Sequence, residues 1–138
     1  MTKKILIVED NLQNMKVVVL ALETHGYTLL EANDGEEALK IAIRDKPDLF
    51  IIDIQLPRIS GLELTKRLRQ MPASSNTPII AVTAYAMKGD KEKVIEAGCD
   101  TYLSKPINTR ELPRVVAKML RDGNGQHQWG GQWERKFL

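Results

Sequence analysis

Three short runs of apolar residues constrain the fold of this chain more than any other feature. They occupy residues 5–8, 49–52 and 79–82 and contain almost no polar alternation. Such runs are typical of strands that are covered on both faces of a sheet. Two weaker segments, residues 101–103 and 27–32, bring the number of predicted strands to five. The segment at 27–32 has fewer hydrophobic residues and is expected at an edge.

Segments with helical periodicity separate these runs. Their apolar residues recur at spacings of three and four, which places them on one face of a helix. The stripes are Met15, Val18, Val19 and Leu22; Ala38, Ile41 and Ala42; Leu64 and Leu68; and Leu112, Val115, Val116 and Met119. A mostly charged segment at 88–97 predicts a fifth helix at the surface, and Gly26 is expected to end the first helix.

Three pairs of residues predict where helices begin. They are Asp34 with Glu37, Ser60 with Glu63, and Asn108 with Glu111. Each pair has the spacing of a capping box, in which a side-chain acceptor is followed three residues later by a glutamate. Pro113 conflicts with a helix capped at Asn108, because a proline inside a helix removes a backbone hydrogen bond. The last helix is therefore expected to begin nearer Pro113.

Strands that alternate with helices predict parallel βαβ units, and hence a doubly wound α/β sheet with helices on both faces. Ligands bind such sheets in the crevice beyond the carboxyl ends of the strands. The predicted strands end in Glu9 and Asp10, in Asp53, in Thr83 and in Lys105. Three carboxylates, a hydroxyl and an ammonium are therefore expected at one edge of the sheet.

This set of groups indicates phosphoryl chemistry. Carboxylates placed close together repel one another unless a cation neutralises them, and an oxygen-only site suits Mg²⁺. Beside Mg²⁺, an ionised Asp53 can attack phosphorus and form an acyl phosphate. The metal, Lys105 and Thr83 would then each address one phosphoryl oxygen. Each residue alone has an ordinary role at a strand end; their convergence is what favours a phosphoacceptor site.

Composition excludes several other functions. Twenty basic and eighteen acidic residues leave a net charge of +2, which is too balanced to indicate nucleic-acid binding by charge. The longest wholly apolar run, residues 17–22, is too short to span a bilayer. The single cysteine, Cys99, excludes an internal disulfide and fits a reducing compartment. We therefore expect a cytoplasmic protein with neither nucleic acid nor membrane as a direct partner.

Four motifs resemble those of receiver domains of two-component response regulators. They are ILIVEDN at 5–11, DIQLP at 53–57 followed by Ser60-Gly61, AVTA at 81–84, and YLSKP at 102–106. The resemblance covers residues from about Lys3 to Arg121. Among receivers, the sequence resembles stand-alone receivers of the DivK type and receivers of hybrid kinases. It implies a flavodoxin-like five-stranded sheet of order 2-1-3-4-5.

The resemblance also implies a role for each matching residue. Asp53 would be the phosphoacceptor, with Mg²⁺ held directly by Asp53 and Asp10, through water by Glu9, and by the backbone carbonyl of Gln55. Lys105 would contact the phosphoryl group, with the N–H of Ala84 as a further donor. The Lys105–Pro106 bond would be cis. At position 9 this chain has Glu where the family more often has Asp. Gln55 and Tyr85 occupy positions that, in the family, tune how fast the phosphoryl group is lost.

The same resemblance implies a switch and its partners. Thr83 would move toward the phosphoryl group and Tyr102 would follow inward, which changes the surface made by segments 88–97 and 101–103 and the last helix. The donor would be a sensor histidine kinase or a histidine phosphotransfer protein, and the changed surface would bind a downstream target. The chain would be a signalling switch and not a turnover enzyme.

Two alternatives and the C-terminal residues remain open. An aspartyl-phosphate phosphohydrolase would commonly carry a second Asp where this chain has Gln55, and a constitutive docking module would have a broken acid pocket. Residues 1–122 form the predicted receiver domain, and residues 123–138 form a glycine-rich tail that is expected to be flexible. Trp129, Trp133 and Phe137 lie four residues apart within this tail, although Gly130 and Gly131 disfavour a helix there.

Overall fold

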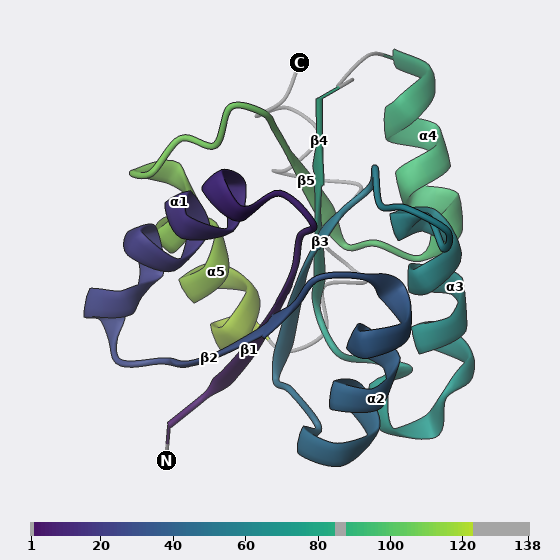
Figure 1. Ribbon diagram of the computed structural model, residues 1–138, viewed down its shortest axis with the longest axis horizontal. Helices are drawn as coiled ribbons and strands as arrows, with labels where there is room; N and C mark the ends of the chain where they lie inside the picture. Colours follow the sequence, from purple (N-terminus) through teal and green to yellow (C-terminus); the bar gives the residue numbers. More distant parts are fainter. Residues whose placement is uncertain (1, 85–87, 123–138) are drawn as a thin grey trace.

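A parallel five-stranded sheet forms the centre of the molecule (Figure 1). The computed structural model describes residues 2–84 and 88–122. The strands are β1 (Lys4–Val8), β2 (Thr28–Ala32), β3 (Leu49–Asp53), β4 (Ile79–Thr83) and β5 (Thr101–Ser104). They lie in the order β2-β1-β3-β4-β5 with parallel pairing throughout. The doubly wound sheet is confirmed, and β2 lies at an edge as expected.

Five helices cover the two faces of this sheet. They are α1 (Leu12–Leu22), α2 (Gly35–Asp45), α3 (Gly61–Gln70), α4 (Lys88–Ala97) and α5 (Glu111–Asp122), with short 3-10 turns η1 (Glu23–His25) and η2 (Pro72–Ser74). Figure 1 shows α1 and α5 on one face and α2, α3 and α4 on the other. This arrangement is the one that right-handed crossovers between parallel strands produce.

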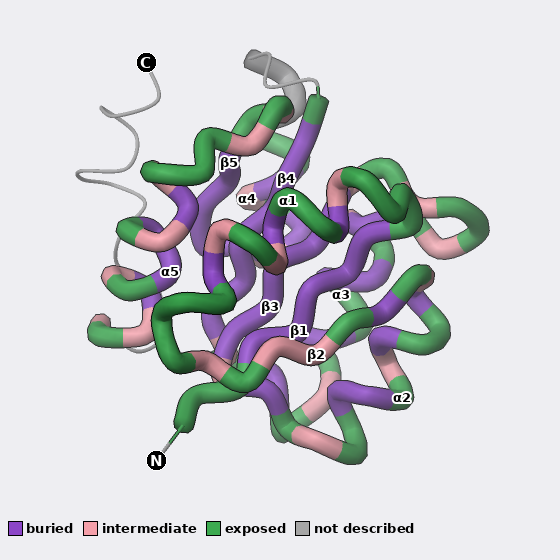
Figure 2. The backbone as a smooth tube through the Cα atoms, turned by 60° about the vertical axis from the view of Figure 1, so that its left-hand side comes forward, coloured by how far each residue is buried: buried purple, intermediate pink, exposed green. Residues whose placement is uncertain are grey.

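Alternate residues of each strand supply two separate cores. In β1, Ile5 and Ile7 pack with α1 and α5, whereas Leu6 and Val8 pack with the helices of the opposite face. Successive side chains of a strand point to opposite faces, so a strand covered on both sides needs apolar residues at every position. Strands β1, β3, β4 and β5 are accordingly buried along most of their length, whereas the edge strand β2 buries only Ala32 (Figure 2). Burial on both faces explains the unbroken apolar runs of β1, β3 and β4.

Side-chain caps begin the helices. The side chains of Asp34, Ser60 and Asn108 accept hydrogen bonds from the backbone N–H groups of Glu37, Glu63 and Glu111, at 2.8, 3.1 and 3.0 Å. All three predicted capping hydrogen bonds are present. Asn11 caps α1 in the same way, by accepting from the N–H of Asn14 at 2.9 Å, and the capping-box spacing does not reveal it because no glutamate follows at the third position.

Pro113 and Gly26 lie where the missing N–H group of proline and the positive φ of glycine are tolerated. Pro113 is the third residue of α5, within the first turn, where no intrahelical partner exists for an N–H group. The conflict between Asn108 and Pro113 therefore disappears, and α5 begins two residues before the proline. The prediction that Gly26 ends the first helix is wrong: α1 ends at Leu22, and Gly26, with a φ of +81°, ends the 3-10 turn η1 that follows it.

Candidate functional site

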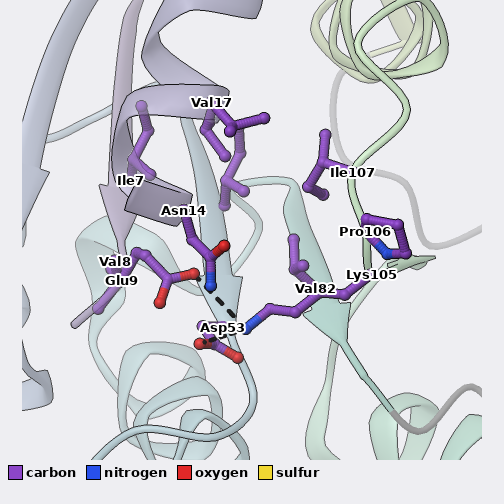
Figure 3. A pocket seen from close by; sticks show the side chains of 12 residues that line it. Ile7, Val8, Glu9, Asn14, Val17, Asp53, Val82, Lys105, Pro106 and Ile107 are labelled. Carbon is purple, nitrogen blue, oxygen red and sulfur yellow. Dashed lines mark hydrogen bonds and ion pairs between the residues drawn. The ribbon is translucent and has the colours of Figure 1, made fainter. Parts of the chain in front are cut away.

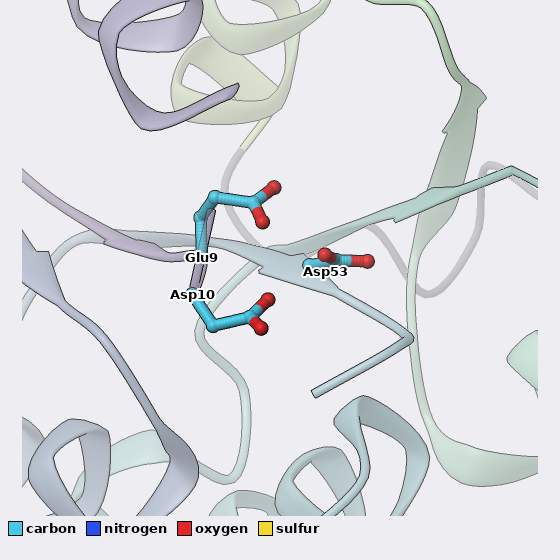
Figure 4. Close-up of side chains that lie close together, drawn as sticks. All are labelled: Glu9, Asp10 and Asp53. Atoms are coloured by element: carbon cyan, nitrogen blue, oxygen red, sulfur yellow. The ribbon is translucent and has the colours of Figure 1, made fainter. Parts of the chain in front are cut away.

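Three carboxylates meet at the carboxyl edge of the sheet. Glu9 and Asp10 follow β1, and Asp53 is the last residue of the neighbouring strand β3. One oxygen from each of the three lies within 4.8 Å of the others (Figure 4). Glu9 is 4% and Asp53 2% exposed, whereas Asp10 is open to solvent. The predicted convergence of the acidic residues is confirmed.

Hydrogen bonds hold the Asp53 carboxylate at both oxygens. The backbone N–H of Gln55 donates to Oδ1 at 3.0 Å, and Nζ of Lys105 donates to Oδ2 at 2.9 Å. Nζ of Lys105 also lies 3.7 Å from Oε1 of Glu9 (Figure 3). The Lys105–Pro106 peptide bond is cis, as the resemblance implies. Asp53 is therefore held in one orientation with the ammonium group of Lys105 beside it.

The local charge balance shifts two pKa values. Burial is the main cause that raises the pKa of Glu9 to about 7; the hydrogen bond from the N–H of Asn11 opposes this effect, and the neighbouring Asp53 adds to it. Burial of Lys105 would lower its pKa, but the hydrogen bond to Asp53 and the surrounding carboxylates outweigh burial and raise it. The site therefore carries excess negative charge that a further cation would neutralise.

An apolar cavity of about 160 Å³ opens beside this charged group. Its walls come from α1, from β1, β3 and β4, and from the segment after Lys105 (Figure 3). Glu9, Asp53 and Lys105 line its polar end, and residues such as Val17, Val18 and Ile107 line the rest. The apolar walls limit the water around Asp53 on this side.

Comparison with known proteins agrees with this site. The family described as "Response regulator receiver domain" matches residues 5–117. The polar-differentiation response regulator DivK of Brucella abortus (strain 2308) is 45% identical over 122 residues, which cover 88% of this chain and 99% of DivK.

The chain belongs to the response regulator receiver family.

Solved structures of receiver domains share this fold at 30% and 35% sequence identity. A CheY-like response regulator receiver domain protein from Methanospirillum hungatei JF-1 superposes with a TM-score of 0.81 at 30% identity, covering 88% of this chain and 96% of that one. The receiver domain of the sensor histidine kinase PA1611 from Pseudomonas aeruginosa PAO1 gives 0.81 at 35% identity, covering 87% and 98%, and holds a magnesium ion coordinated in its active-site cleft. This chain is therefore a signalling module, not a turnover enzyme.

Gly61 brings the first turn of α3 directly against the backbone of this receiver's Asp53. A Cβ atom at Gly61 would overlap the carbonyl oxygen of Asp53 and lie 2.6 Å from Cα of Ile54. The N–H of Gly61 donates to the carbonyl of Ile54 at 2.9 Å. Only a residue without a side chain permits so close an approach. Spacing alone does not reveal this role, and the Ser60-Gly61 pair in the receiver motif is its sequence signal.

Arg58 links the segment after Asp53 to the start of α2. Its Nη2 atom lies 2.9 Å from Oδ2 of Asp34, which also caps α2. The backbone of Arg58 is left-handed, with a φ of +64°, a conformation that residues other than glycine rarely adopt. No pattern in the sequence indicates this contact, because the two residues lie on separate loops.

The residues of the receiver's expected switch lie near the same edge. Thr83 is the last residue of β4 and 2% exposed, and its carbonyl accepts the N–H of Lys105 at 2.8 Å. Ala84 follows it and is exposed. Tyr102 in β5 is 5% exposed and packs in the core on the α2–α4 face, so its side chain is already buried. Tyr85 lies outside the described residues.

None of the helices in residues 2–84 and 88–122 has the length and hydrophobicity that crossing a membrane requires.

Proposed function

We propose that this receiver is a phosphorylation-dependent switch in which Asp53 accepts a phosphoryl group. The observation that carries the proposal is the buried Asp53 carboxylate, which lies beside Glu9 and Asp10 and 2.9 Å from the ammonium of Lys105. The proposed donor is a phosphohistidine on a sensor histidine kinase or a histidine phosphotransfer protein. Family membership supports this donor class.

The donor set fits a magnesium ion. Glu9, Asp10 and Asp53 offer only hard oxygen ligands within 4.8 Å, and the carbonyl of Gln55 would add another, with Glu9 acting through water. Mg²⁺ prefers such ligands and retains room for waters and phosphate oxygens. When bound, it would neutralise the carboxylates and stabilise charge on the phosphoryl oxygens. The magnesium in the related PA1611 receiver supports this assignment.

The proposed transfer forms one bond and breaks one. A carboxylate oxygen of Asp53 attacks the phosphorus of phosphohistidine, the phosphorus–nitrogen bond breaks, and the imidazole leaves with its electron pair and takes up a proton. The hydrogen bond from the N–H of Gln55 holds the attacking carboxylate in place. Attack by water on the acyl phosphate would later return Asp53 and inorganic phosphate. Preorganised positioning of this kind is the main source of catalysis in phosphoryl transfer.

Lys105, Thr83 and Ala84 would receive the transferred group. The ammonium of Lys105 already contacts Asp53, so it would need only a small movement to pair with a phosphoryl oxygen. The hydroxyl of Thr83 and the N–H of Ala84 would address the remaining oxygens. These contacts exist only with the phosphoryl group present, so they would favour the active conformation.

The output would be a changed protein–protein surface. Movement of Thr83 would alter the packing of Tyr102 and hence the α4–β5–α5 face, where we place the downstream target. We propose residues 1–122 as the receiver domain and residues 123–138 as a tail without a fold of its own. The chain contains a single cysteine, so an internal disulfide cannot form, which fits a reducing compartment, and we propose the cytoplasm as the location.

Intact-mass measurement of the acyl phosphate tests this function. We expect acetyl phosphate and Mg²⁺ to add one phosphoryl mass to the wild type, and to add none to Asp53→Asn or in the presence of EDTA. Asp45→Asn, which changes a carboxylate at the end of α2, is the matched control and should be phosphorylated normally. No adduct in the wild type, together with no binding of beryllium fluoride, would instead favour a constitutive docking module.

A further inference from the structure

The outer face of α1 is more apolar than a solvated helix face requires. Leu12 is 71%, Leu20 63% and Val17 37% exposed. The inner face of the same helix already supplies Met15, Val18 and Leu22 to the core. A surface helix normally presents polar residues opposite its core stripe. On α1 the exposed Lys16 stands between Leu12 and Leu20, and the three apolar residues around it form an outer stripe that the described part of the chain leaves open.

We propose that the C-terminal segment of this chain, residues 123–138, docks along this outer stripe of α1. The segment continues directly from α5, which packs beside α1 on the same face of the sheet (Figure 1). Both helices follow a parallel strand and therefore run back toward the amino edge of the sheet, so Asp122 lies at the end where α1 also finishes.

The length of the segment matches the distance that it must cover. Residues 123–128 precede Trp129 and reach about 20 Å when extended. An eleven-residue helix such as α1 is about 16 Å long, so Trp129 can reach any point on its outer face.

The composition of the segment matches the chemistry of the stripe. Its large apolar residues are Trp129, Trp133, Phe137 and Leu138, and the three aromatic ones bury large areas when they dock on leucine side chains. Gly130 and Gly131 disfavour a helix in the isolated segment, so its order would come from contact with α1 and not from local propensity.

Charge favours one direction of docking. The segment starts at the Leu20 end of α1 and would run toward Leu12, which lies two positions after Asp10. Arg135 and Lys136 would then approach the end of the helix where three carboxylates gather. The attraction between these charges should weaken with ionic strength.

Tryptophan fluorescence tests this docking directly. Both tryptophans of the chain, Trp129 and Trp133, lie in the segment, so emission reports on the segment alone. We expect the full chain to emit at shorter wavelength than a free peptide of residues 123–138, and acrylamide to quench it severalfold less. Leu20→Asp should return both values toward those of the peptide, while far-UV circular dichroism confirms that the variant is folded. Emission and quenching in the wild type that equal those of the peptide would overturn the proposal.

Ile43→Asp provides the matched control. Ile43 on α2 is 63% exposed, as is Leu20, but it lies on the opposite face of the sheet, so this variant should keep the wild-type emission. An equal red shift in both variants would refute docking on α1. Dilution distinguishes docking within one chain from docking between two copies. Emission that does not change with concentration in a monomer supports the contact within one chain. Loss of the blue shift on dilution would assign the stripe to a second copy and would overturn the proposal. None of these readouts depends on phosphorylation.

Discussion

Replacing Glu9 with Gln should stabilise the metal-free protein by an amount that grows as the pH rises from about 4.5 to 7 and then levels off. Burial raises the pKa of Glu9 from 4.5 to about 7, so the folded state binds a proton here that the unfolded state releases. This proton's contribution to stability is fully present below pH 4.5 and is lost as the pH rises through 7. Glutamine at position 9 stays uncharged at every pH, so the variant does not lose the stability that the wild type loses when Glu9 ionises.

The size of the effect follows from the two pKa values. One pKa unit corresponds to about 1.4 kcal/mol, so the difference between 4.5 and about 7 gives a stabilisation of roughly 3 kcal/mol for Glu9→Gln at pH 8. Near pH 4.5 the wild type and the variant should have nearly equal free energies of unfolding. The side chain is 5% exposed, so solvent screens the charge little.

Urea denaturation in EDTA at pH 5, 6, 7 and 8, followed by circular dichroism, measures this difference. Glu92→Gln, a change of an exposed carboxyl group on α4, is the control and should show no growing gap from the wild type. Saturating Mg²⁺ should abolish the advantage of Glu9→Gln, because a bound cation stabilises the ionised carboxylate. A difference between Glu9→Gln and the wild type that stays constant from pH 5 to 8 would refute the reasoning.

Three further substitutions probe the site and its supports. Gly61→Ala should destabilise the fold by about 2 to 3 kcal/mol, because its Cβ overlaps backbone atoms, and should slow acyl-phosphate formation; an unchanged urea midpoint would contradict this. Asp34→Ala should cost about 1 kcal/mol through loss of the cap on α2, also measured by urea denaturation. Lys105→Met should tighten Mg²⁺ binding, because it removes a cation adjacent to the site, and it should also slow phosphorylation. The rise of the melting temperature with Mg²⁺ concentration measures the binding. The same Mg²⁺ dependence in Lys105→Met and in the control Lys118→Met would contradict the tighter binding.

Local sequence signals were enough to predict most of the fold. The unbroken apolar runs of β1, β3 and β4 follow from burial on both faces, and the caps at Asp34 and Ser60 follow from local hydrogen-bond chemistry. Parallel pairing then brings the strand ends to one edge, which is why the sequence alone predicts that Asp53 and Glu9 lie together. These features depend on neighbours in sequence or on the topology alone.

Features that depend on contacts between loops could not be predicted. The overlap that forbids a side chain at Gly61 arises where α3 meets the backbone after Asp53. The left-handed Arg58 and its bond to Asp34 join segments 24 residues apart. The pKa of Glu9 needs the depth of its burial. Each property is set by three-dimensional packing, which neither periodicity nor spacing encodes.

Sheet geometry explains why the acidic residues stay together despite their repulsion. Val8 pairs with Ile52 in the register of β1 and β3, so the next residues, Glu9 and Asp53, leave the sheet side by side. Neighbouring strands lie about 4.8 Å apart, and the two cores that flank β1 and β3 hold this spacing. The carboxylates therefore cannot relax by moving apart. Their repulsion can be relieved only by a proton, by Lys105 or by an added cation, so stability stored in the cores maintains a site that binds positive charge.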